Sequence, residues 1–280
     1  MNGVQALRNA VRESLKHSST HLLGEAVELS PITRGLSAEF PGQVHALPAS
    51  DAGLIGLATG MALGGATPIV ELSGPDALWG AIQQLGQEAA AFASNPEFQA
   101  TLVVRVPAPP GSGDLSPLLA SVPGLAIAAA GQAGEAADLL RAALGRRGPT
   151  VIVEPSDILT QDISEDEPLP LGKARILRAG TQVTALAWGP GVPAALAAAE
   201  ALAARGVSLE VLDLRCLNPL DEAAIAESVH RTGRALLVGG AATVLVATVR
   251  AAFLRLEAPP AAVAALPSAI ADAAIAALNY

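Results

Sequence analysis

The chain has 280 residues, of which 51% are hydrophobic and only 15% charged, and its formal net charge is −9. No run of about 18 apolar residues is free of glycine, proline or polar interruptions, which argues against a membrane span. The basic residues form no cluster larger than Arg146–Arg147, which argues against nucleic acid and anionic membrane surfaces as partners. The composition therefore favours small molecules and other proteins as partners.

Cysteine and histidine usage narrows the chemistry further. Cys216 is the only cysteine, which excludes an intrachain disulfide and a cysteine-based zinc site. The four histidines show no spacing typical of a metal site, and we expect no metal ligands in this chain. Because a chain without disulfides suits a reducing compartment, and residues 1–19 lack the apolar core of a secretory signal, we expect a cytoplasmic protein.

Strand-like and helix-like runs alternate along the whole chain. In chain order the strand-like runs are HLL, QVHAL, TPIVEL, TLVVRV, LAIAAA, TVIVEP, VTALAW, VSLEVLDL and RALLVGG. The runs between them are rich in alanine and leucine, as is typical of helices. This alternation predicts an α/β fold, with two three-layer α/β/α domains built on mainly parallel sheets.

One shift in composition marks the boundary between these domains. The segment 160-TQDISEDEPLPLGKARILRAG-180 is acidic at first and then contains proline and glycine. We therefore predict a first domain at 1–160, a linker at 161–172 and a second domain at 173–280.

The segment 51-DAGLIGLATGMALGGATP-68 combines a lone carboxylate, Asp51, with a helical pattern unusually rich in glycine. A glycine inside a helix costs about 1 kcal/mol relative to alanine, so its frequent use here favours close approach of another backbone or of a ligand. Packing against a neighbouring helix is the more common reason. The smooth face of this helix also suits self-association of the chain.

Two long blocks of the sequence resemble one known family. The block from LLGEAVELSPITRG to GGATPIVEL resembles the beta subunit of the decarboxylase component of 2-oxo acid dehydrogenases of the pyruvate and branched-chain type. The block from GTQVTALAWGPGV to RALLVGG resembles the C-terminal domain of that family, with DLRCLNPLD at the place of its DLRxLxPxD signature. The resemblance covers nearly the whole chain and implies a transketolase-type pyrimidine-binding domain followed by a transketolase-type C-terminal domain.

The same resemblance implies an activity and a set of partners. The chain would be a beta-type subunit of a thiamine-diphosphate-dependent 2-oxo acid dehydrogenase, working with an alpha subunit in an α2β2 heterotetramer. A lipoyl or carrier-protein acceptor would take the acyl group. In the family, a GDG-type motif of the alpha subunit holds magnesium and the diphosphate. Here Gly113–Asp114 lacks the following glycine and the spaced asparagine, so we expect the Mg²⁺ site in the alpha partner.

The resemblance also implies the site residues. In the family, a glutamate that ends a PxSE motif bonds to the aminopyrimidine of the cofactor and activates it; the matching segment here is 48-PASD-51. This places Asp51, one methylene shorter, in the catalytic and cofactor-binding position, and Glu25 at the family's first glutamate close to the cofactor. The aromatic residue expected on the pyrimidine falls near Ala77 and Leu78, and the neighbouring Trp79 either substitutes for it or packs into a helix interface.

Two further positions depart from the family pattern. Leu115 precedes Ser116 where the family has a His–Ser pair. Arg146 stands where the family often has an acidic residue near a potassium ion, and its guanidinium either replaces the charge of that ion or is solvated.

Two interpretations therefore stay open. In the first, the chain is an active, divergent beta subunit in which Glu25 and Asp51 contact the cofactor. In the second, it is a catalytically degenerate paralogue that serves assembly, and Asp51 merely caps a helix that begins at Ala52.

Overall fold

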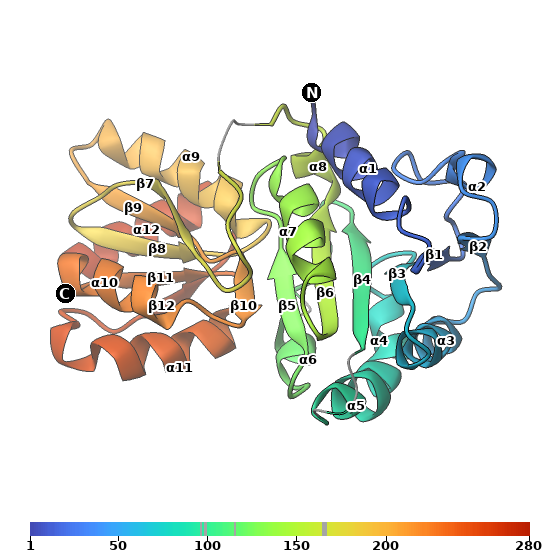
Figure 1. Cartoon of the computed structure of the whole chain (residues 1–280). Helices are drawn as coiled ribbons and strands as arrows, with labels where there is room; N and C mark the ends of the chain where they lie inside the picture. The colour runs from blue at the N-terminus through green and yellow to red at the C-terminus, as the bar shows by residue number, and fades with distance from the viewer. Residues whose placement is uncertain (96, 98–99, 115, 164–166) are drawn as a thin grey trace. The chain divides into compact units, whose positions relative to one another are not determined.

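A computed structural model of the chain describes residues 1–95, 97, 100–114, 116–163 and 167–280. The chain divides into two compact units, Met1–Leu171 and Gly172–Tyr280. Each unit contains a mainly parallel sheet with helices packed on it (Figure 1), which confirms the predicted α/β fold. The division falls at the end of the segment 161–172 that we predicted as a linker.

The sheet of the first unit is parallel at every recorded pairing. Its strands follow the order β5-β6-β4-β3-β1-β2. They are β1 Thr20–Gly24, β2 Val44–Ala46, β3 Thr67–Glu71, β4 Thr101–Ala108, β5 Ala126–Ala129 and β6 Gly148–Pro155. The central strands are buried along almost their whole length, as expected for a parallel sheet covered on both faces.

The helices of the first unit connect these strands. They are α1 Gly3–Ser14, α2 Leu36–Glu39, α3 Asp51–Leu63, α4 Ala77–Gln83, α5 Ala91–Ala93, α6 Ser116–Ala120, α7 Glu135–Leu144 and α8 Ser156–Leu159, with a π-helical segment η1 Gln84–Ala90 between α4 and α5. Helix α1 begins with a capping box, in which Asn2 Oδ1 accepts from the Gln5 amide at 3.0 Å and Gln5 Oε1 accepts from the Asn2 amide at 3.2 Å.

The second unit has a sheet with the order β12-β11-β8-β9-β7, in which only the β7–β9 pairing is antiparallel. Its strands are β7 Arg175–Arg178, β8 Val183–Ala187, β9 Leu209–Asp213, β11 Ala235–Val238 and β12 Ala261–Val263, and a short strand β10 Cys216–Asn218 follows β9. Its helices are α9 Gly191–Ala203, α10 Glu222–Thr232, α11 Ala241–Ala252 and α12 Pro267–Leu278, with a 3-10 turn η2 Phe253–Arg255.

Small side chains shape the core of the second unit. Ala195, Ala198 and Ala199 of α9 and Ala274 of α12 are buried in one cluster with the valines and leucines of the sheet. Because alanine adds little volume, these helices can lie close to the strands that they cover.

Candidate active site

Three connections that carry predicted site residues leave the first sheet at the same edge. Glu25 directly follows β1, Asp51 begins the helix that follows β2, and Trp79 lies in the helix that follows β3. Strand β1 pairs in parallel with both β2 and β3, with its last residue Gly24 opposite Ala46 and Glu71. Since the carboxyl ends of parallel strands share one edge of a sheet, the fold gathers these connections where ligands of open α/β sheets bind.

Asp51 is the first residue of α3 and does not cap it. The cap is Ser50, whose Oγ accepts from the Gly53 amide at 3.2 Å. The interpretation that Asp51 caps a helix beginning at Ala52 is therefore wrong. Within the described part of the chain, the Asp51 carboxylate accepts no hydrogen bond, and it lies at the positive end of the dipole of α3.

The Asp51 side chain packs against the backbone of α4. A Cβ atom built on Gly80 would lie 2.9 Å from Asp51 Oδ2 and 3.1 Å from Asp51 Cβ. About one turn further along, a Cβ atom on Gly56 of α3 would lie 3.3 Å from Gln84 Oε1. The two helices lie side by side (Figure 1), and glycine at these points permits the close helix packing that the sequence predicted.

The other predicted residues differ in exposure. Glu25 is exposed, and no described residue donates a hydrogen bond to its carboxylate. Leu78 is fully buried and offers no surface to a ligand, whereas Trp79 is 60% exposed. The alternative that Trp79 packs into a helix interface is therefore wrong within this chain, and its indole is an exposed aromatic surface on α4.

A buried ionic cluster that the sequence analysis missed lies near the same sheet edge. Arg105 on β4 donates from Nε and Nη2 to the two carboxylate oxygens of Glu154 on β6, at 2.8 and 2.9 Å. Its Nη1 donates to Glu71 Oε2 on β3 at 2.7 Å. All three side chains are at most 3% exposed, so one guanidinium serves two carboxylates away from water. We call Glu71, Arg105 and Glu154 the buried triad.

Burial and charge act in opposition within the buried triad. Burial raises the pKa of Glu154 above its ordinary value, and this outweighs the lowering effect of Arg105. Burial alone lowers the pKa of Arg105, but the two carboxylates outweigh it, so that pKa stays above its ordinary value. The sequence signal for this cluster is a single charged residue inside each of three apolar runs, TPIVEL, TLVVRV and TVIVEP.

The buried triad also contacts the loop that carries Glu25. Thr33 is fully buried in this loop, and its Oγ1 donates to Glu71 Oε1 at 3.5 Å. On the other side, a Cβ atom on Gly24 would lie 2.6 Å from the Glu71 carbonyl oxygen. The segment before Glu25 therefore rests directly on the strand that contributes to the triad.

The guanidinium of Arg146 is bound by backbone carbonyls. Its Nη1 donates to Pro149 O at 3.2 Å and its Nη2 to Gly124 O at 3.4 Å. The alternative that this side chain is simply solvated is therefore wrong, because its guanidinium donates to the carbonyl of Gly124 and to that of Pro149 in β6. Leu115, the other departure from the family pattern, lies outside the described residues.

Metal ligands and membrane segments can be examined across the described residues. Among them, no group of three or more His, Cys, Asp or Glu side chains could hold a metal ion. Within the same part of the chain, no helix combines the length and the hydropathy needed to cross a bilayer.

Comparison with known proteins places this chain in a family. Residues 172–279 match the family model of the transketolase C-terminal domain. The chain is 30% identical to the pyruvate dehydrogenase E1 component subunit beta of Acholeplasma laidlawii, over 92% of this chain and 86% of that protein. It is 32% identical to the 2-oxoisovalerate dehydrogenase subunit beta of Bacillus subtilis, over 85% of this chain and 79% of that protein.

A solved structure shows the same fold at lower sequence identity. It is described as a split gene transketolase, an inactive beta4 tetramer, and it matches with a TM-score of 0.85 and 18% identity over 100% of this chain and 98% of that one. With relatives this similar over most of its length, the chain belongs to the family of beta subunits of the E1 component of pyruvate and 2-oxoisovalerate dehydrogenases.

Proposed function

We propose that this chain is the beta-type subunit of an active thiamine-diphosphate-dependent 2-oxo acid dehydrogenase, decarboxylating a 2-oxo acid together with an alpha subunit. The observation that carries the proposal is the placement of Glu25 and Asp51. Glu25 directly follows β1 and Asp51 begins the helix after the neighbouring strand β2, both at the carboxyl edge of the sheet, and neither carboxylate accepts a hydrogen bond from a described residue. Such groups are available to a ligand.

The residues at this edge fit one half of the cofactor. The aminopyrimidine ring has a flat apolar face and nitrogen atoms on its rim, and the site offers the exposed indole of Trp79 and the carboxylates of Glu25 and Asp51. Thiamine diphosphate, when bound, supplies the electron sink for loss of CO₂ from a 2-oxo acid. Asp51 would hold a proton at the pyrimidine ring, Glu25 would fix the ring, and Trp79 would shield its face from water.

The partner assignments follow from what this chain offers. We assign the Mg²⁺ and diphosphate site to an alpha subunit in an α2β2 assembly, and a lipoyl or carrier-protein acceptor takes the acyl group. Self-association uses the outer face of α3, where Leu57 is 47% exposed and a Cβ atom on Gly60 would meet nothing within 4 Å. We also propose a cytoplasmic location, because a chain with a single cysteine, here buried, suits a reducing compartment.

Asp51→Asn tests the catalytic assignment. It keeps the size of the side chain and removes the ionisable carboxylate, so we expect turnover of the complex with the alpha subunit to fall about 10²–10⁴-fold. Because Ser50 is the cap, the free energy of unfolding should change by less than about 0.5 kcal/mol. Decarboxylation and urea denaturation are the two measurements.

Ser50→Ala is the matched control. It removes the cap next to Asp51 and should cost about 1 kcal/mol of stability while turnover stays near that of the wild type. Unchanged turnover in Asp51→Asn would overturn the catalytic assignment. The alternative, a non-catalytic subunit that serves assembly, would then be favoured. That alternative no longer includes a capping role for Asp51, because Ser50 is the cap.

A further inference from the structure

Gly80 is a glycine whose backbone does not require one. It lies inside α4 and is absent from the residues with positive φ among those described. Glycine in such a position lowers helix stability relative to alanine, so the missing Cβ must serve something other than the helix itself. The neighbour that a Cβ would meet is Asp51.

A Cβ atom on residue 80 would make close contacts with both ends of the Asp51 side chain. A Cβ atom on residue 80 would lie 2.9 Å from Oδ2, the tip of the side chain, and 3.1 Å from Cβ, its base. The tip can swing away by rotation about χ1. The base is attached to the backbone of α3 and cannot, so an added methyl group would push the first turn of α3 away from α4.

We propose that Gly80 is a positioning residue for Asp51: by lacking a side chain it lets the first turn of α3 close onto α4, which sets where the Asp51 carboxylate lies at the carboxyl edge of the sheet. This inference rests on the proposed function, since the position of the carboxylate matters only if Asp51 contacts the cofactor. It adds to that function a residue that touches neither cofactor nor substrate and acts through Asp51.

The first experiment uses the chain without cofactor or partner. Gly80→Ala should lower the melting temperature, because α3 and α4 are forced apart. Gly86→Ala is the matched control, since this glycine belongs to the same continuous helical segment and its Cβ would meet only Val122, at ordinary contact distances of 3.5 and 3.7 Å. In an Asp51→Gly background, which removes Cβ as well as the carboxylate, the loss caused by Gly80→Ala should shrink. A loss of the same size in both backgrounds, or an equal effect of the two alanine substitutions, overturns the inference.

The second experiment uses the complex with the alpha subunit, thiamine diphosphate and a 2-oxo acid. A Cβ contact of 3.1 Å makes its neighbour give by a few tenths of an ångström. Because a displacement of about 1 Å in a catalytic group costs about 10²-fold in rate, we expect kcat of Gly80→Ala to fall roughly three- to ten-fold, with little change in KM for the 2-oxo acid. Gly86→Ala should keep wild-type kcat. The double variant Asp51→Ala with Gly80→Ala should be no slower than Asp51→Ala alone, because Gly80 acts only through Asp51.

The two experiments separate the possible failures. Independent melting effects overturn the positioning role alone and leave the proposed function intact. Wild-type turnover in Asp51→Ala overturns the proposed function, and with it the reaction that the positioning would serve. Additive losses of turnover in the double variant also overturn the inference, because Gly80 would then act by another route.

Discussion

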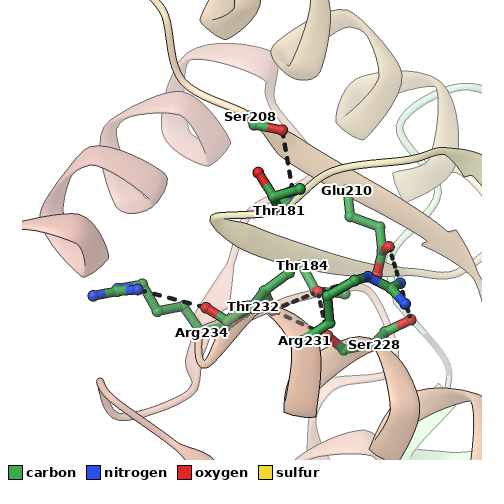
Figure 2. A network of polar contacts seen from close by, with 8 residues as sticks. All are labelled: Thr181, Thr184, Ser208, Glu210, Ser228, Arg231, Thr232 and Arg234. Atoms are coloured by element: carbon green, nitrogen blue, oxygen red, sulfur yellow. Dashed lines mark hydrogen bonds and ion pairs between the residues drawn. The ribbon is translucent and has the colours of Figure 1, made fainter.

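Each unit of this protein contains a buried carboxylate that is paired with an arginine, but the two arginine side chains differ in their exposure to water. In the first unit, Arg105 is fully enclosed and serves two carboxylates, Glu71 and Glu154. In the second unit, Arg231 bonds to a single buried carboxylate, Glu210, and its own side chain is 37% exposed (Figure 2). An enclosed charge depends entirely on its partners, whereas an exposed one can exchange a partner for solvent.

The two arrangements also occupy opposite edges of their sheets. The buried triad lies toward the carboxyl ends of β3, β4 and β6, next to the loop of Glu25. Glu210 and Thr184 are each the second residue of a strand, and Thr184 Oγ1 donates to Glu210 Oε1 at 3.2 Å near the amino ends of β9 and β8. Ser228 and Thr232 of α10 complete this second network (Figure 2). Of these two networks, the one with the fully enclosed arginine stands beside the candidate active site.

Breaking the buried triad should have the largest effect. Arg105→Met leaves two carboxylates buried without their partner, and removing one member of a buried ionic group costs about 3–5 kcal/mol. Urea denaturation of the isolated chain measures this loss. Arg141→Met is the control, because Arg141 pairs with Asp138 at the surface and should contribute less than about 1 kcal/mol. If Arg105→Met loses no more stability than the surface control Arg141→Met, the buried triad does not depend on its arginine as proposed.

The equivalent change in the second unit should cost less. Arg231→Met leaves Glu210 buried, but Thr184 still donates to it and water can enter where the arginine side chain was exposed. We expect a loss of about 1.5–3 kcal/mol, the usual range for a hydrogen bond to a charged group. The same denaturation assay compares it with Arg105→Met. If Arg231→Met proves the more costly of the two, exposure does not govern the difference between the units.

The smallest expected effect is on the pH dependence of stability. Glu154 and Glu28 should change the slope of stability against pH in opposite directions. The pKa of Glu154 is raised by burial, so the folded state binds this proton more strongly than the unfolded state does. The stability of wild type relative to Glu154→Gln should therefore be greatest below the ordinary carboxyl pKa of 4.5 and fall as pH rises through the raised value.

Glu28 supplies the opposite sign. Hydrogen bonds from Ser37 and from the Gly35 amide lower the pKa of this exposed carboxylate. The stability of wild type relative to Glu28→Gln should therefore be present above the ordinary pKa and be lost as pH falls through the lowered value. Melting temperatures across this pH range test both, and slopes of the same sign would show that burial does not control Glu154.

Much of the fold could be predicted from the sequence because its central strands are continuous apolar runs. Each of the nine predicted runs corresponds to an observed strand, from β1 to β11. The strands that were missed, β7, β10 and β12, are short, and β7 and β12 have partly exposed residues. Strands of three or four residues give only a weak local pattern, and pairing with neighbours defines them.

The candidate site was only partly predictable. Family motifs located Glu25 and Asp51, and parallel pairing placed them at one edge of the sheet. The contact between Asp51 and Gly80 depends on how two helices pack, which no local pattern encodes. Likewise, the sequence displays Arg105 as a charge inside a strand, but its two partners lie 34 and 49 residues away. Only the order of the strands brings them together.

That long separation gives the buried triad a second consequence, during synthesis of the chain. The strands TPIVE, TLVVRVPA and GPTVIVEP are rich in β-branched residues, and such segments bind to copies of themselves when they are exposed. A charge inside each segment opposes this aggregation. Because sheets built from distant segments form slowly, the three strands stay unpaired for longer than a hairpin would. We therefore expect Glu71, Arg105 and Glu154 to oppose aggregation of the nascent chain until they pair in the folded sheet.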